Sequence, residues 1–225
     1  MKKLVAGLCF AASFIASAHA GLIHQYDLNG TLADALGGPS LVANGGSLGP
    51  SGYTFGFGQG LSLSNPGITT VYRIELVLSL DPECDIKFCK LIDFKNLGDD
   101  GGLYTAPSNQ LALFPIALAG TPVGNGSVSL VLSRDAAGIV SALKDDVLQF
   151  TVNDPLDVAA VSNNILWFFQ DDGQQGNPGE HPKGFVDSIR IFDDPQGAAA
   201  PVPGTLLLLA SAGLAWSVSR RKHRR

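Results

Sequence analysis

Basic residues are scarce in the body of this chain, by which we mean residues 21–195. The body has eight lysines and arginines and all twenty acidic residues, so its formal charge is −12, whereas the 225-residue chain totals −5. The other seven basic residues lie at the two ends. Because the body could not neutralise the phosphates of DNA or RNA, we expect no nucleic acid among its partners.

Glutamate is also scarce, since the body contains only Glu75, Glu83 and Glu180. Retaining glycoside hydrolysis needs two carboxylates about 5 Å apart. No Glu-x-Asp-x-x-Glu segment, which supplies such a pair in glucanases, occurs in the sequence. A His-Glu-x-x-His helix and a glycine-rich phosphate loop are lacking too. We therefore expect that the protein is not an enzyme.

Helical periodicity is weak throughout the body. Residues 136–146 come closest to it, but Gly138 and Val140 weaken the pattern. Alternation of apolar and polar residues dominates instead, and 27 glycines and 13 prolines supply turns between the alternating segments. The predicted strands are 22–28, 53–57, 71–80, 88–94, 111–118, 127–133, 147–152, 165–170 and 185–192. This pattern predicts one all-β sandwich or jelly roll.

The N-terminus has the pattern of a secretory signal peptide over residues 1–20. Lys2 and Lys3 precede an apolar stretch, and 18–20 reads Ala-His-Ala, a small-x-small cleavage site. Cleavage between Ala20 and Gly21 would start the mature protein at Gly21.

The C-terminus has the pattern of a membrane anchor. A Pro/Ala linker over 196–203 leads into an uncharged apolar run over 204–219, and a basic tail follows over 220–225. Sixteen helical residues span about 24 Å, to which snorkelling arginines can add several ångströms. Basic tails stay in the cytoplasm, so we expect the acidic body to lie outside it, anchored in the inner membrane.

This C-terminal segment resembles the PEP-CTERM sorting signal of Gram-negative bacteria. The resemblance rests on the proline-flanked entry, the apolar run and the arginine cluster: Pro201, Val202, Pro203, Gly204, Arg220 and Arg221. It implies processing by an exosortase-type enzyme, with release to the cell surface or extracellular matrix, in a host that makes exopolysaccharide. The usual Pro-Glu-Pro is Pro-Val-Pro in this chain.

A second resemblance covers most of the body. Residues 22–34 resemble the opening of laminin-G-like, concanavalin A-like domains, and 134–138 resemble the turn after their central strand. Residues 184–192, Gly-Phe-Val-Asp-Ser-Ile-Arg-Ile-Phe, resemble their closing strand. The resemblance implies a concanavalin A-like jelly-roll β-sandwich over 21–195.

Only two cysteines remain after the signal peptide, Cys84 and Cys89. They flank four residues between two predicted strands, where a hairpin could bring them together. In an oxidising compartment this spacing favours a disulfide.

The loop over 170–184 contains no aliphatic residue and carries several hard oxygen ligands, which are the type that calcium prefers. The candidate ligands are Asp171, Asp172, Asn177, Glu180 and Asp187. Strict alternation places Asp187 on the same face as Phe185, Ile189 and Ile191, where an unpaired carboxylate would be costly. The alternative is that Asp171 and Asp172 begin a solvated turn and Asp187 accepts backbone hydrogen bonds.

Tyr53, Phe55 and Phe57 alternate with small residues and share one face of a predicted strand. Such a stripe could stack on sugar rings. Burial statistics favour the alternative, in which the stripe faces the core.

The body therefore fits a non-catalytic module that binds exopolysaccharide or another surface component. A secreted glycoside hydrolase or lyase and a purely structural matrix protein are the alternatives.

Overall fold

The computed structural model describes residues 21–171 and 179–194 of the chain. Several predictions lie outside these residues: the signal peptide with Ala20, the ligands Asp172 and Asn177, the linker, the apolar run, the basic tail and the six sorting-signal residues. Within the described part of the chain, no helix has both the length and the apolar character that a membrane crossing requires.

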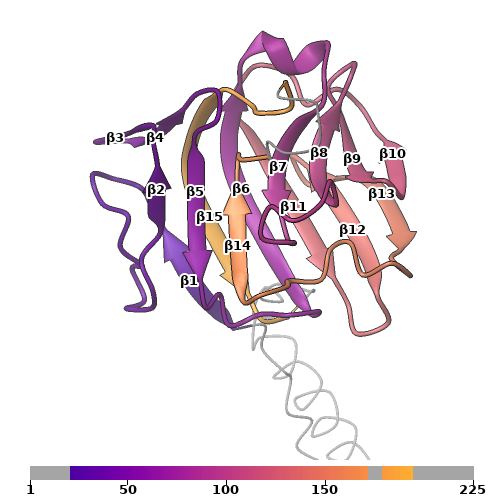
Figure 1. Ribbon diagram of the computed structural model, residues 1–225, viewed down its shortest axis with the longest axis horizontal. Helices are drawn as coiled ribbons and strands as arrows, with labels where there is room; N and C mark the ends of the chain where they lie inside the picture. The colour runs from indigo at the N-terminus through magenta and orange to yellow at the C-terminus, as the bar shows by residue number, and fades with distance from the viewer. Residues whose placement is uncertain (1–20, 172–178, 195–225) are drawn as a thin grey trace, which may run out of the picture.

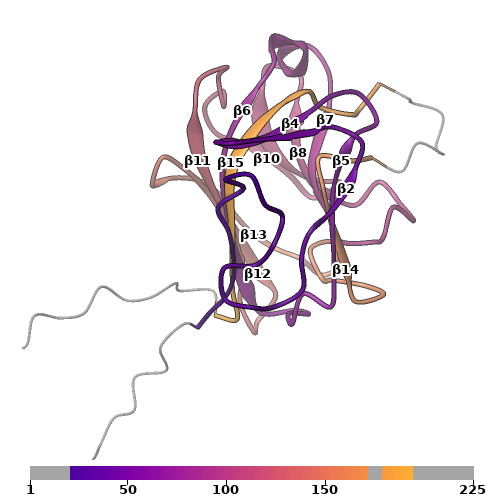
Figure 2. The ribbon, with the colours of Figure 1, turned by 90° about the vertical axis from the view of Figure 1, so that its left-hand side faces the viewer.

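The described residues form two antiparallel sheets, which Figure 2 shows as two layers. The larger sheet has eight strands. Seven of them run in the order β13 (Val147–Asn153), β12 (Ile139–Lys144), β11 (Val128–Arg134), β6 (Tyr72–Leu80), β15 (Gly184–Phe192), β4 (Gly52–Phe55) and β3 (Ser47–Gly49). The eighth strand, β1 (Leu22–Tyr26), pairs with β15, as β4 does.

The smaller sheet has seven strands and carries the candidate site. Its order is β10 (Ala117–Ala119), β9 (Gln110–Phe114), β8 (Gly102–Ala106), β7 (Cys89–Asp93), β14 (Ile165–Phe168), β5 (Gly60–Ser64) and β2 (Val42–Asn44). A short 3-10 helix, η1 (Pro82–Asp85), connects β6 of the first sheet to β7 of the second (Figure 1).

One hydrophobic core fills the space between the sheets. In β6 every second residue from Tyr72 to Leu80 is buried, as the alternation predicts. These side chains belong to the same cluster as Leu91 of β7 and Leu166 of β14, which come from the opposite sheet. The all-β prediction is confirmed, and the architecture is a two-sheet β-sandwich.

Some elements differ from the sequence-based prediction. The expected strand over 111–118 is split into β9 and β10 by a turn, in which the Ile116 amide donates to the Leu113 carbonyl at 2.6 Å. Residues 139–144 form β12, which joins β13 through a two-residue turn of Asp145 and Asp146, both at positive φ. Strands β2, β3, β5, β8 and β12 were not predicted, because they are short or lack regular alternation.

Candidate functional site

The register of β7 and β8 separates residues that face the core from residues that face away from it. Lys90 lies opposite Tyr104, and Asp93 lies opposite Gly102. The intervening Leu91 and Leu103 belong to the core cluster. Because cross-strand partners share a face, Lys90, Asp93 and Tyr104 lie on the face of the smaller sheet that is turned away from the core, which we call the outer face.

A fully buried lysine lies on this outer face. The Lys90 ammonium is 2.8 Å from the Asp93 carboxylate and 3.3 Å from that of Asp171, and it donates to the Asp99 carbonyl at 3.0 Å. Both Lys90 and Asp93 have no exposed surface. Asp93 also accepts the amides of Lys95 and Leu97. The Lys90–Asp93 ion pair therefore holds the loop after β7 beside the start of β8.

Three carboxylates meet next to this pair. One oxygen each from Asp100, Asp171 and Glu180 lie within 4.8 Å of one another. The Tyr104 hydroxyl donates to Asp171 at 3.3 Å. Burial raises the pKa of Tyr104 well above its ordinary value, and the negative charges of these three carboxylates raise it further. The local potential is therefore negative.

A pocket of about 200 Å³ opens beside these carboxylates, lined by Phe88, Asp100, Tyr104, Phe114 and Glu180. We call it the aromatic pocket. Two neighbouring hollows of about 310 and 290 Å³ share Phe114 with it, one lined also by Asp100 and the other by Phe88. The three adjoin, so an extended ligand could occupy more than one of them.

The predicted calcium ligands are only partly brought together. Asp171 and Glu180 belong to the carboxylate cluster, and Asp100, which was not among the candidates, completes it. The expectation that Asp187 is buried is wrong. A β-bulge between Val186 and Ser188 shifts the register against β6, and the Asp187 side chain is exposed. The oxygen ligands of the cluster suit a hard cation in type, and calcium binding stays a prediction.

The predicted aromatic stripe does not form a binding surface. Tyr53 and Phe55 are buried in the core, and the single proton of the Tyr53 hydroxyl has two acceptors within reach, the carbonyls of Gly45 and Gly60 at 2.8 and 2.9 Å. Phe57 is 53% exposed, with its ring 4.9 Å from that of His181. The core interpretation therefore holds for Tyr53 and Phe55. It does not extend to Phe57, because strand β4 ends before that residue.

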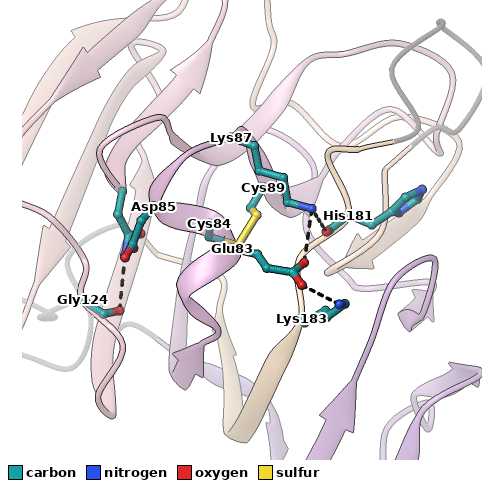
Figure 3. Close-up of a disulfide and its surroundings, with 9 residues drawn as sticks. Glu83, Cys84, Asp85, Lys87, Cys89, Gly124, His181 and Lys183 are labelled. Carbon is teal, nitrogen blue, oxygen red and sulfur yellow. Dashed lines mark hydrogen bonds and ion pairs between the residues drawn. A yellow bond between two sulfur atoms is a disulfide. The ribbon is translucent and has the colours of Figure 1, made fainter.

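The disulfide expected between Cys84 and Cys89 is present and lies next to the segment that carries Glu180. Figure 3 shows Lys87 and Lys183 on either side of the Glu83 carboxylate, at 3.7 and 2.6 Å. The Lys90 amide donates to the Glu180 carbonyl at 2.9 Å. These contacts tie the Glu180 segment to the η1 turn and so position one wall of the aromatic pocket.

Sequence reasoning missed Asp100, Tyr104 and the role of Phe88 and Phe114. Asp100 precedes Gly101 and Gly102, a turn signal after the predicted strand over 88–94. That signal could have indicated a hairpin that places Asp100 in the connection between two paired strands. The pairing of Tyr104 with Lys90 depends on a register that a β-bulge between Lys90 and Ile92 sets, and no sequence pattern shows it.

No family model matches the chain, and no curated protein sequence matches it. Solved structures of similar fold do match. One is a Trypanosoma rangeli sialidase in complex with 2,3-difluorosialic acid, with a TM-score of 0.60 and 14% identity over 78% of this chain. This chain spans 31% of the sialidase.

Two other solved structures are similar to this chain. Domain 4 of an extracellular GH43 arabinanase from Geobacillus stearothermophilus, in complex with arabinotriose, gives a TM-score of 0.53 at 17% identity, covering 81% of this chain and 96% of that domain. A structure of botulinum neurotoxin type C, whose cell entry depends on two ganglioside molecules, gives 0.57 at 11% identity, covering 79% and 48%. At these identities the likenesses establish the β-sandwich class alone.

Proposed function

We propose that the chain is an exported, non-catalytic domain that binds a glycan in the aromatic pocket. The observation that carries this proposal is the composition of the pocket: Phe88 and Phe114 supply aromatic surface beside the buried Tyr104, and Asp100 and Glu180 supply hydrogen-bond acceptors. Sugar rings present apolar C–H faces that stack on aromatic rings and hydroxyls that donate to carboxylates. A mostly apolar cavity with a few polar groups is typical of ligand sites.

The similar structures support the choice of ligand class. The sialidase is bound to a difluorosialic acid, the arabinanase domain to arabinotriose, and the neurotoxin interacts with gangliosides. Each of these ligands is or contains a carbohydrate. We infer the finer assignment, a laminin-G-like jelly roll, from the sequence motifs of residues 22–34 and 184–192.

The biological setting is part of the same proposal. We infer that residues 1–20 direct export, that 204–219 anchor the chain in the inner membrane, and that an exosortase-type enzyme processes the tail. The support is the sequence pattern of the two ends together with the disulfide, which suits an oxidising compartment. Exopolysaccharide is then the glycan that the pocket would meet.

A glycan array probed with the full chain tests the binding proposal. We expect specific glycans to be bound, and Phe114→Ala to weaken the binding about five- to tenfold, because it removes a stacking surface. Phe114 is 39% exposed, so its loss should leave the fold intact. Leu148→Ala is the matched control, since Leu148 is 58% exposed on β13 of the other sheet. Binding to no glycan, or equal binding by Phe114→Ala, would contradict the proposal.

A glycoside hydrolase is the second candidate, because the carboxylate cluster has oxygens within 4.8 Å of one another. Retaining hydrolysis uses a pair about 5–5.5 Å apart. Asp171 is buried, whereas Asp100 and Glu180 line the aromatic pocket, so these two are the pair that could contact a substrate. Release of reducing sugar from an array-positive glycan, abolished by Glu180→Gln, would establish this alternative.

A serine hydrolase has weaker support. Residues 45–49, Gly-Gly-Ser-Leu-Gly, match the Gly-x-Ser-x-Gly pattern. That motif needs a strand-to-helix turn around the serine. Ser47 instead begins β3, which forms a hairpin with β4. The match therefore lies in a hairpin and lacks the strand-to-helix turn of that motif, so it does not support a serine hydrolase.

A further inference from the structure

The three rings of the aromatic pocket stand nearly perpendicular to one another. The ring centroids of Phe88 and Tyr104 are 6.2 Å apart, and each lies 6.0 Å from that of Phe114. The interplanar angles are 86°, 64° and 69° for Phe88–Tyr104, Tyr104–Phe114 and Phe88–Phe114. These edge-to-face contacts hold the rings together as one cluster, in which Tyr104 is almost completely buried and Phe114 is 39% exposed. An ammonium group that reaches the exposed face of Phe114 would be attracted to it, because ring faces are electronegative.

The charge of the pocket also favours a cation. Asp100 and Glu180 line it, and the carboxylate of Asp171 lies directly behind them. The negative charges of all three raise the pKa of Tyr104 beyond the effect of burial, so their field reaches the ring that forms one wall. An acidic sugar would be repelled by these carboxylates, and a neutral sugar would gain hydrogen bonds from its hydroxyls but no ion pair.

The protein already buries one ammonium group in surroundings of the same kind. The Lys90 ammonium lies 5.3 Å from the centroid of the Tyr104 ring, is paired with Asp93 and Asp171, and donates to the Asp99 carbonyl. An aromatic ring, carboxylates and a carbonyl therefore suffice to hold an ammonium group here. The aromatic pocket adjoins this lysine through Tyr104 and offers two more carboxylates and two more rings.

We propose that the aromatic pocket binds a protonated amine, and that its ligand is a glycan with free amino groups, such as a polymer of deacetylated hexosamine. This inference rests on the proposed function and names the class of glycan. A volume of about 200 Å³ is below the range of about 300–1,000 Å³ typical of sites for drug-sized ligands, so it suits one residue of the polymer. The adjoining hollows that share Phe114 would accommodate neighbouring residues of the polymer.

Titration calorimetry of the full chain with two hexasaccharides of equal length tests the inference. One probe is the glucosamine hexamer and the other is the N-acetylglucosamine hexamer, which lacks the positive charges. At a pH where the amines are protonated, we expect the glucosamine hexamer to bind about tenfold more tightly, the effect of one desolvated cation–π contact. Phe114→Ala and Phe88→Leu should each reduce that affinity several-fold, and Leu148→Ala should not.

The aromatic variants also control for general attraction between a polycation and an acidic protein. Phe114→Ala leaves the net charge unchanged, so equal binding of the glucosamine hexamer by this variant would overturn the inference. Tighter binding of the N-acetylated hexamer, still weakened by Phe114→Ala, would overturn the amine preference and leave the proposed glycan site standing. Lack of binding by both hexamers and by every array glycan would overturn both.

Discussion

Lys90 carries a charge that is fully buried, so its stability depends on its partners. A buried charge is tolerated only when it is paired, and Lys90 has Asp93, Asp171 and the Asp99 carbonyl as partners. In return, its ammonium pairs with two buried carboxylates and offsets one of their two negative charges. The positive charge of Lys90 thus allows the Asp93 and Asp171 carboxylates to be buried beside strand β7, all of whose residues are buried.

Replacing this lysine should strongly destabilise the fold. Lys90→Met keeps an unbranched side chain that is one atom shorter but leaves Asp93 and Asp171 without their cation, so we expect a loss of about 3–5 kcal/mol in the free energy of unfolding. Guanidinium unfolding measures it. Lys144→Met is the control, because Lys144 forms a solvent-exposed hydrogen bond to the Pro122 carbonyl and should cost less than about 1 kcal/mol. Equal losses in the two variants would show that the buried pair has no special role.

The buried carboxylate of Asp34 predicts that the free energy of unfolding depends on pH. Burial alone would raise the pKa of Asp34, but hydrogen bonds from the Gln25 amide, the His24 ring and the Leu36 amide outweigh burial and lower it. The resulting stabilisation is complete above the ordinary aspartate pKa of about 3.9 and is lost as the pH falls through the lowered value.

We therefore expect Asp34→Asn to flatten the decline of unfolding free energy between about pH 4 and about pH 2. Urea unfolding at a series of pH values measures this slope. Asp187→Asn, which alters an exposed side chain, serves as the control and should keep the wild-type slope. A wild-type slope in Asp34→Asn would contradict the prediction.

Among the elements, the η1 turn has the most direct bearing on the site. Its disulfide joins residues five apart in sequence, and the Glu180 segment pairs with the start of β7 directly after it. Closing so short a loop contributes about 2 kcal/mol by the chain-entropy estimate. The Cys84–Cys89 disulfide therefore constrains the start of β7, which in turn helps to position Glu180 through the hydrogen bond between the Lys90 amide and the Glu180 carbonyl.

Removing the disulfide should lower the free energy of unfolding by that amount and weaken glycan binding. The variant Cys84→Ala/Cys89→Ala measures the stability change by guanidinium unfolding. Adding a thiol reductant to the wild type should reproduce it, and adding reductant to the variant should change nothing. A wild type that is equally stable with and without reductant would contradict this account.

At the level of strands, alternation predicted elements best where one face is buried and the other is solvated. The long strands β6, β11 and β15 were found for this reason. Alternation failed in two physical situations. Strands β7 and β8 are buried on both faces, which hides their register, and the bulge in β15 reverses the side on which Asp187 lies.

The candidate site was predictable only in part for a related reason. Asp171 and Glu180 could be found because they lie in a polar loop. Asp100 and Tyr104 come from a hairpin whose contact with that loop is long-range, so the sequence contains no local sign of it. For Tyr53 and Phe55, the core interpretation that burial statistics favoured was right, and the alternative of a sugar-stacking stripe was wrong.

For the whole molecule, the separation of charge has consequences for ligand choice. The body carries −12, so its surface repels acidic polymers and attracts cationic ones over about a Debye length. We expect affinity for the glucosamine hexamer to fall as sodium chloride is raised from about 0.05 to about 0.5 M. Binding of a polyuronate, if measurable, should strengthen over the same range because salt screens the repulsion. An affinity for the glucosamine hexamer that rises with salt, or polyuronate binding that weakens with salt, would contradict this electrostatic account.

Hydrogen–deuterium exchange of the full chain, with and without its tightest-binding array glycan, tests the central claim most directly. The account predicts that the glycan protects backbone amides around the aromatic pocket, in β8, β9 and the segments holding Phe88, Asp100 and Glu180. Strand β13 of the larger sheet should exchange as before. Protection confined to the larger sheet, with none around Tyr104 and Phe114, would contradict the claim that the outer face of the smaller sheet binds the ligand.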